Sequence, residues 1–158
     1  MSTESLGPII QTATVAIFPP DMKEILVTYN VKLDWFLPVG GKFEIGDGKI
    51  LYTALWETRE EAWITLFPGS GVFLDKQWKP VIDPQVVNES SYKFPDLKEG
   101  KDALFFFRMH DKPSFVLPEK TFFIPKSVYS WDCMEFEGIT YRFVAENIRS
   151  EILKVMQA

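Results

Sequence analysis

Three glutamates lie close together near the middle of the chain, at Glu57, Glu60 and Glu61. Positions i, i+3 and i+4 of a helix lie within one turn of each other, so a helix here gathers the three carboxylates on one face. Carboxylate oxygens are the ligands that hard divalent cations such as Mg²⁺ and Mn²⁺ prefer. Like charges at this spacing repel by roughly 0.2–0.5 kcal/mol per pair on an exposed helix, so a solvated acidic face is the alternative interpretation.

A glycine-rich segment precedes these glutamates. Gly40-Gly41 is followed by Gly46-Asp47-Gly48, and the pattern then becomes helical from Ile50 to Trp63. Glycine and aspartate clusters of this kind mark turns and loops. A glycine-rich loop directly before three helical carboxylates favours a metal site over a solvated face.

The segment from Gly41 to Ile64 resembles the Nudix box, G-x5-E-x7-R-E-U-x-E-E-x-G-U, in which U is a bulky aliphatic residue. Gly41 matches the first glycine of this signature, and Asp47 stands at its first glutamate. The three glutamates match its E-U-x-E-E core, and the small and apolar pair Ala54-Leu55 before them also fits.

Four positions depart from the signature. Asp47 replaces a glutamate, Thr58 replaces the aliphatic residue, and Trp63 replaces the late glycine. Trp56 stands at the arginine, which eight residues rather than seven separate from the acid. In the family this arginine pairs with the acid and fixes the loop against the helix. Because an indole forms no charged pair, we expect the substitution to affect loop order and rate more than metal binding.

The resemblance implies an α/β (α+β) fold, a Nudix-like α/β/α sandwich with a central mixed β-sheet. It implies a metal-dependent hydrolase of a diphosphate linked to another moiety, with Mg²⁺ or Mn²⁺ as the cofactor. Glu57, Glu60 and Glu61 would be metal ligands, with the Gly41 carbonyl as an extra one. Glu57 or Glu60 would also be catalytic, by orienting or deprotonating the attacking water. The substrate would be a small-molecule diphosphate, and the signature does not name the residues that bind it.

The departures keep a second function open. A degenerate Nudix domain, catalytically weak or inactive, would bind a ligand or a protein partner without turnover. A third interpretation is a structural domain with a solvated acidic helix.

Residues outside the signature are further candidates for the site. A fourth acidic ligand often comes from a distant loop in this family, and Glu89, Glu99 and Asp102 are the candidates for it. His110 and Lys112 follow an apolar segment and could contact a substrate. A lone histidine at such a position is more often a surface residue.

Apolar patterns predict the elements that hold the site. Strands are expected at Ile9–Phe18, Glu24–Tyr29, Trp35–Pro38, Ala103–Met109 and Thr121–Pro125. The first two are expected to form a hairpin around Pro19–Lys23. Residues 74 to 100 are polar and are expected to form a long connection. An amphipathic helix is expected over Tyr141–Met156.

A helical wheel divides the segment from Ile50 to Trp63 into stripes. The stripe expected to face the core consists of Leu51, Leu55, Thr58 and Ala62. The glutamates share another stripe with Thr53 and Ala54. The third stripe, here called the aromatic stripe, consists of Tyr52, Trp56, Arg59 and Trp63. We expect it to pack beneath residues 74 to 100, with an exposed surface for a partner chain as the alternative.

The composition narrows the classes of protein to which this chain could belong. A chain of 158 residues is expected to form a single domain over residues 1–158. A net charge of −5 argues against general nucleic-acid binding. Cys133 is the only cysteine, which excludes an intramolecular disulfide. The sequence shows no signal peptide and no transmembrane segment, so we expect a cytoplasmic protein without a membrane partner. The oligomeric state is open, and a homodimer is one possibility.

Overall fold

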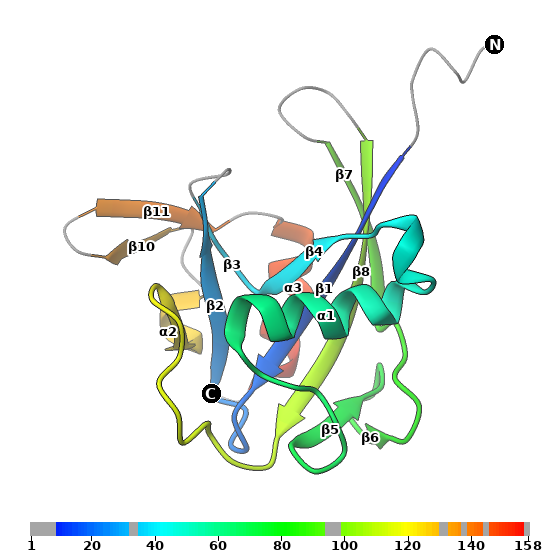
Figure 1. Ribbon diagram of the computed structural model, residues 1–158. Helices are drawn as coiled ribbons and strands as arrows, with labels where there is room; N and C mark the ends of the chain where they lie inside the picture. The colour runs from blue at the N-terminus through cyan, green and yellow to red at the C-terminus, as the bar shows by residue number, and fades with distance from the viewer. Residues whose placement is uncertain are drawn as a thin grey trace.

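The structure is a computed structural model (Figure 1), and it describes residues 9–31, 35–93, 99–129, 133–136, 139–143 and 146–156. The strands in that part of the chain are β1 (Ile10–Phe18), β2 (Glu24–Asn30), β3 (Trp35–Leu37), β4 (Val39–Lys42), β5 (Gly71–Leu74), β6 (Pro80–Val81), β7 (Asn88–Lys93), β8 (Glu99–Met109), β9 (Thr121–Pro125), β10 (Cys133–Phe136) and β11 (Ile139–Phe143). The helical segments are η2 (Ile45–Asp47), α1 (Ile50–Ala62), α2 (Lys126–Tyr129) and α3 (Glu146–Val155).

The strands form two mixed sheets. The first has the order β4-β1-β8-β5-β6, and β7 also pairs with β8. The second has the order β10-β11-β3-β2-β9. Strands β1 and β8 run parallel, with Ile10 opposite Gly100 and Phe18 opposite Arg108, while β4 pairs antiparallel with β1. The long β1–β8 pair is therefore the centre of the first sheet.

Alternation along β1 and β8 gives the first sheet two buried faces, because successive side chains of a strand point to opposite sides. Ala13, Val15 and Phe105 belong to the core cluster that includes Ala54 and Ala62 of α1. Apolar residues that point to the other side, such as Ala16, Leu104 and Phe106, belong to a second cluster, which includes residues of α3. We call these sides the α1 face and the α3 face. Helices thus cover both sides of a mixed sheet (Figure 1), which confirms the predicted fold class.

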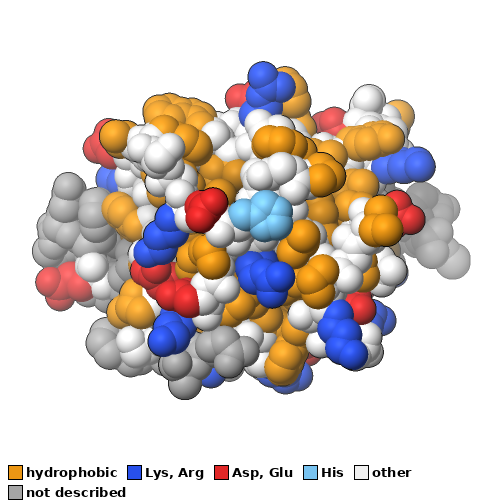
Figure 2. All heavy atoms as spheres, turned by 90° about the horizontal axis from the view of Figure 1, so that it is seen from below, with side chains coloured by type: hydrophobic (Ala, Val, Ile, Leu, Met, Phe, Trp, Pro, Cys, Tyr) orange, Lys and Arg blue, Asp and Glu red, His pale blue; other side chains and the backbone are white. Residues whose placement is uncertain are grey.

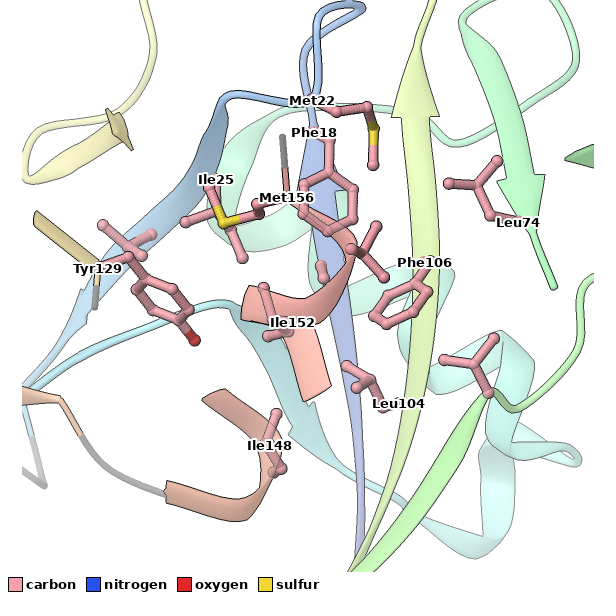
Figure 3. Close-up of a cluster of buried hydrophobic side chains, with 14 of the residues drawn as sticks. Phe18, Met22, Ile25, Leu74, Leu104, Phe106, Tyr129, Ile148, Ile152 and Met156 are labelled. Carbon is pink, nitrogen blue, oxygen red and sulfur yellow. The ribbon is translucent and has the colours of Figure 1, made fainter. Parts of the chain in front are cut away.

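The α3 face holds an aromatic and aliphatic core, shown in Figure 3. Ile148 and Ile152 of α3 are buried in one cluster with Phe18 of β1 and Phe106 of β8. The rings of Phe18 and Phe106 meet edge to face, with centroids 5.8 Å apart. Tyr129 of α2 joins this cluster and is 1% exposed. This core fixes α3 against the side of the first sheet that lies away from α1, and α2 packs beside α3 and the second sheet.

Several predicted elements are correct. Strands appear over the five predicted ranges; four of them change by at most one residue at an end, and the strand predicted from Ala103 begins at Glu99. The helix that bears the glutamates ends at Ala62, one residue early. None of the helices in the described residues is long and apolar enough to cross a membrane.

Three predictions about elements are wrong. Strands β1 and β2 do not form a hairpin, because each pairs within a different sheet. Residues 74 to 100 are not a simple connection, since β6 pairs with β5 and β7 pairs with β8. The last helix begins at Glu146 rather than Tyr141, because residues 139 to 143 form β11 and pair with β10 and β3.

Candidate functional site

Helix α1 lies directly over the two glycines of β4. Gly41 is paired with Ala13 of β1, and a side chain at Gly41 would overlap the Glu57 carboxylate. Gly40 is equally restricted, because a β-carbon there would overlap the Ala13 carbonyl oxygen and lie 3.2 Å from Thr14 Oγ1. The predicted glycine loop therefore begins later, because both glycines are strand residues. Gly41 leaves room for Glu57 of the helix, and Gly40 leaves room for β1.

Glu61 is tied to this strand. The backbone N–H of Gly40 donates a hydrogen bond to Glu61 Oε1, with N and O 3.1 Å apart. Burial is the main cause that raises the pKa of Glu61 to about 7. The hydrogen bond from Gly40 opposes this shift, and the nearby Glu57 charge adds to it. The Glu61 carboxyl is therefore partly protonated at neutral pH in the metal-free protein.

Glu57 lies beside Glu61 and over Gly41. It is half-buried, and its pKa is raised first by burial, then by the charges of Asp47 and Glu60. Glu60 itself is exposed on the outer side of the helix. The helix thus brings Glu57 and Glu61 against β4, and it leaves the third predicted ligand in solvent.

Asp47 is held at the N-terminal end of α1 without an arginine. Thr53 Oγ1 donates to Asp47 Oδ2 at 2.8 Å, and the Glu44 N–H donates to the same oxygen at 3.0 Å. These hydrogen bonds lower the pKa of Asp47, with the Glu44 contribution the larger. The sequence placed Thr53 on the glutamate stripe but did not reveal this role. A neutral hydroxyl takes the contact that an arginine makes in the Nudix family.

The donor atoms at this site are oxygens, which suit a hard divalent cation. Two carboxylates with raised pKa values lie next to each other, so a cation between them would relieve both burial and repulsion. Within the described residues, no group of three acidic, histidine or cysteine side chains is gathered closely enough to hold a metal ion. The donor types fit a cation, and a third side-chain ligand would require a different orientation of Glu60.

The three candidates for a distant acidic ligand lie elsewhere. Glu89 of β7 is exposed. It pairs with Ala103 of β8, which pairs in turn with Ala13 of β1, and Ala13 pairs with Gly41 of β4. Three strand spacings of about 4.8 Å separate such a residue from Gly41, roughly 14 Å in all. Glu99 is exposed at the start of β8.

Asp102 is buried on the α3 face, away from the glutamates. Its Oδ1 accepts hydrogen bonds from Thr12 Oγ1 at 2.6 Å and Thr14 Oγ1 at 2.7 Å. Within the described part of the chain its Oδ2 has no hydrogen-bond partner. Burial raises the pKa of Asp102 to about 6, and the two threonine hydroxyls oppose this shift. Asp102 therefore joins β8 to β1 and does not face the glutamate site.

His110 and Lys112 lie on a different side of the molecule. Figure 2 shows the side that carries the chain's only histidine, seen from below. His110 is exposed, and its Nε2 lies 3.1 Å from the Pro68 carbonyl oxygen. Lys112 pairs with Glu24 and lies over the Phe123 ring, 5.5 Å from its centroid. Both residues have contacts of a surface kind, and neither is brought to the glutamates.

The aromatic stripe is exposed. Tyr52, Trp56 and Trp63 are 50%, 54% and 59% exposed, and Arg59 is exposed between them. The prediction that this stripe packs beneath residues 74 to 100 is therefore wrong. The core side of α1 is formed instead by Thr53, Ala54, Thr58 and Ala62, while Leu51 and Leu55 are half-buried. Small residues at these positions let the helix lie close to the sheet.

Of the comparisons with known proteins, only the one with solved structures finds similar proteins. No protein-family model matches the chain, and neither does any curated protein sequence. The dihydroneopterin triphosphate pyrophosphohydrolase of E. coli is similar over 92% of this chain and 94% of its own, with a TM-score of 0.65 and 14% identity. A NUDIX-family hydrolase from Clostridium perfringens covers the same shares, with a TM-score of 0.59 and 14% identity.

A third similar structure is the Ap4A hydrolase of C. elegans. It matches 76% of this chain and 83% of its own, with a TM-score of 0.56 and 15% identity. The chain therefore has the Nudix fold. At this level of identity the likeness defines the fold alone, and the function has to be argued from the site.

Proposed function

We propose that this chain is a Nudix-type hydrolase that cleaves a diphosphate linked to another moiety, with Mg²⁺ or Mn²⁺ as its cofactor. One observation carries the proposal: Glu57 and Glu61 lie side by side over two adjacent glycines, and a side chain at Gly41 would overlap Glu57. An ordinary solvated acidic face has no need of half-buried carboxylates with raised pKa values. Their placement costs stability, which is typical of functional sites.

Glu57, Glu61 and the Gly41 carbonyl would hold the cation, with Glu60 joining from the outer side of the same turn. The cation would neutralise the diphosphate and polarise its phosphorus–oxygen bonds. Glu57 is half-buried beside the other carboxylates, and its raised pKa makes it a better proton acceptor than an ordinary glutamate. We therefore assign it the task of accepting the proton of the attacking water.

The test is cleavage of a panel of diphosphates, followed through release of the phosphorylated products, because a diphosphate linked at both ends yields two phosphate monoesters and no free phosphate. The panel holds a nucleoside diphosphate derivative, a dinucleotide, a prenyl diphosphate and an inositol diphosphate, each with Mg²⁺, Mn²⁺ or EDTA. We expect cation-dependent release that falls by at least roughly tenfold in Glu57→Gln and in Glu61→Gln, since each loses a charged ligand. The matched control is Glu119→Gln, which removes one exposed carboxylate outside α1. Equal turnover in all four proteins would refute the assignment.

The exposed aromatic stripe favours a second function, which is binding without turnover. Half-exposed tryptophans at Trp56 and Trp63 are unusual on a monomeric surface and typical of contact surfaces. The same panel separates the two functions when Mn²⁺ binding is measured by calorimetry alongside. Cation binding that is lost in Glu61→Gln, without release from any diphosphate, would favour the degenerate domain.

A further inference from the structure

A basic hollow lies between α2 and α3. Its volume is about 450 Å³, and the described residues that line it are Lys126, Arg149, Ser150, Leu153 and Lys154. It belongs to the side of the molecule away from α1, because α3 packs on the opposite face of the first sheet (Figure 1). It is therefore separate from the glutamate site.

The charge of this hollow is opposite to that of the protein. The chain carries a net charge of −5, yet three of its 17 basic side chains line this one place. Glu151 offsets part of this charge, because Lys154 Nζ lies 3.2 Å from Glu151 Oε1. A concave surface lined by one sign of charge concentrates the field and attracts ions of the other sign.

Two of the three cations are held in place by the fold. Lys126 Nζ donates to the Met156 carbonyl oxygen at 3.1 Å, at the C-terminal end of α3. Arg149 is only 8% exposed, and its charge acts on the buried Tyr129 hydroxyl, opposing the rise in pKa that burial causes. A ligand that enters the hollow therefore meets two basic groups whose positions are already set, which lowers the ordering cost of binding.

The chemistry of these groups selects the ligand. A guanidinium, two ammonium groups and the Ser150 hydroxyl are the donors that phosphate oxygens accept from. A volume of about 450 Å³ lies in the range of small-molecule sites and leaves room for more than a lone phosphate ion. We infer that the hollow between α2 and α3 binds the phosphate group of a small organic phosphate. This binding goes beyond the proposed hydrolase function and requires no metal.

The experiment is titration of the whole protein with AMP and with inorganic phosphate in the presence of EDTA. Binding is followed through the backbone amide signals of Ser150 and Leu153 by NMR. We expect saturable shifts with both probes, tighter binding of AMP, and weakening of both as NaCl is raised. Absence of shifts at these two amides would overturn the inference, and so would tighter binding of phosphate than of AMP.

Variants assign the binding to the hollow. The double variant Lys126→Gln with Lys154→Gln should weaken AMP binding by at least roughly tenfold, because two charged donors are lost. The control, Lys76→Gln with Lys79→Gln, makes the same change in net charge at exposed positions of the segment between β5 and β6. It should bind AMP like the parent protein. Equal weakening in both double variants would overturn the inference.

Two further variants test whether AMP binding depends on positive charge and whether AMP binds in the hollow. Glu151→Gln removes the carboxylate that competes for Lys154, so AMP should bind more tightly. Glu57→Gln with Glu61→Gln should leave AMP binding in EDTA unchanged, even if it abolishes hydrolysis of diphosphates. Weaker binding in Glu151→Gln, or loss of binding in the α1 variant, would contradict an anion site between α2 and α3. Failure of the hydrolase proposal alone would leave these results untouched.

Discussion

The backbone amide of Gly40 donates a hydrogen bond to the Glu61 carboxylate, which joins strand β4 to helix α1 at the candidate site. One residue later, Gly41 lies against the Glu57 carboxylate and has no room for a side chain. Two consecutive strand residues thus support two carboxylates that are one helical turn apart. The absence of a β-carbon at Gly41 is what allows Glu57 to come this close, whereas at Gly40 it allows β1 to lie close to β4.

The two glycines should respond differently to alanine. In Gly41→Ala the new methyl group meets the flexible end of Glu57, which can move away, so we expect little loss of stability, below about 1 kcal/mol. Cation affinity and any turnover should fall, because Glu57 is displaced. In Gly40→Ala the methyl group meets the backbone oxygen of Ala13, so β1 and β4 must separate, at a cost of about 1–3 kcal/mol.

Urea denaturation and calorimetric titration with Mn²⁺ check this pair of variants. Each serves as the control for the other, since both add one methyl group to the same strand. Similar losses of stability in the two variants would contradict the close contact of Glu57 with Gly41.

Asp102 should make the stability depend on pH. Its pKa is about 6 in the folded protein and 3.8 in the reference state, so the folded state holds the proton more tightly. Ionisation of Asp102 therefore destabilises the fold. The destabilisation is complete well above pH 6, falls as the pH drops through 6, and is gone only below the unfolded pKa of 3.8. From the two pKa values, this group contributes about 2 kcal/mol more stability at pH 4 than at pH 7.

The variant Asp102→Asn isolates this contribution, because it has no proton to exchange at that position. Free energies of unfolding are measured by urea denaturation at pH 4.5 and pH 7.5 for both proteins. The parent protein should gain more stability at the lower pH than the variant does, although Glu61 and other carboxyls titrate in both. Parallel pH profiles would show that the Asp102 carboxyl is not held in the buried position described above.

The backbone conformation of Trp63 explains why the Nudix signature favours a glycine at this position. Trp63 follows the last residue of α1 with φ of 58°, and its N–H donates to the Arg59 carbonyl oxygen. This left-handed conformation is the one that ends many helices and favours glycine, because a β-carbon is strained there. Trp63 is 59% exposed, so its removal sacrifices limited packing. We therefore expect Trp63→Gly to stabilise the protein, by up to about 1 kcal/mol.

The measurement is the midpoint of urea denaturation, with Trp56→Gly as the matched comparison. Trp56 has a similar exposure but lies inside the helix, where glycine costs about 1 kcal/mol relative to alanine. The two variants should shift the midpoint in opposite directions. A loss of stability in both would mean that the Trp63 side chain contributes more packing than its exposure suggests.

The sequence predicted local features well and non-local ones poorly. The helix from Ile50 to Ala62 followed from its periodicity, which neighbouring residues determine alone. The pairing of β1 with β8 joins segments about 90 residues apart, and no local pattern specifies such a partner. The Tyr141–Phe143 segment has apolar residues spaced for either a helix or a strand, and pairing with β10 and β3 decides for the strand.

The same limit applies to the site. Signature spacing located Glu57, Glu61 and Gly41, since those residues lie near each other in sequence. The exposure of Glu60 depends on how α1 is rotated over β4, which the small residues beneath the helix determine. The role of Asp102 in joining β1 and β8 is visible only in the structure, where Thr12 lies opposite it and Thr14 lies two residues further along β1. The available signal was an aspartate directly before the apolar run that begins at Ala103.

The remaining prediction concerns Trp56, at the position of the family's arginine. Trp56 is 54% exposed, so Trp56→Arg places a guanidinium in solvent and should change the free energy of unfolding by less than about 1 kcal/mol. This outcome contradicts a packed core role for the indole. Restoring the family's ion pair requires Asp47→Glu as well. Asp47 already accepts hydrogen bonds from Thr53 and the Glu44 amide, so the longer glutamate side chain should weaken both hydrogen bonds.

A double-mutant cycle separates the coupling between the two substitutions from the effect of each one alone. Free energies of unfolding are measured for the parent, Trp56→Arg, Asp47→Glu and the double variant, with and without Mg²⁺. Asp47 lies at the surface, where ion pairs contribute about 0.2–1 kcal/mol, so we expect a coupling energy in that range and little dependence on Mg²⁺. Thr53 would then be the group that orders the segment before α1. A coupling energy above about 2 kcal/mol, or one that appears only with Mg²⁺, would mean that the missing arginine limits the site after all.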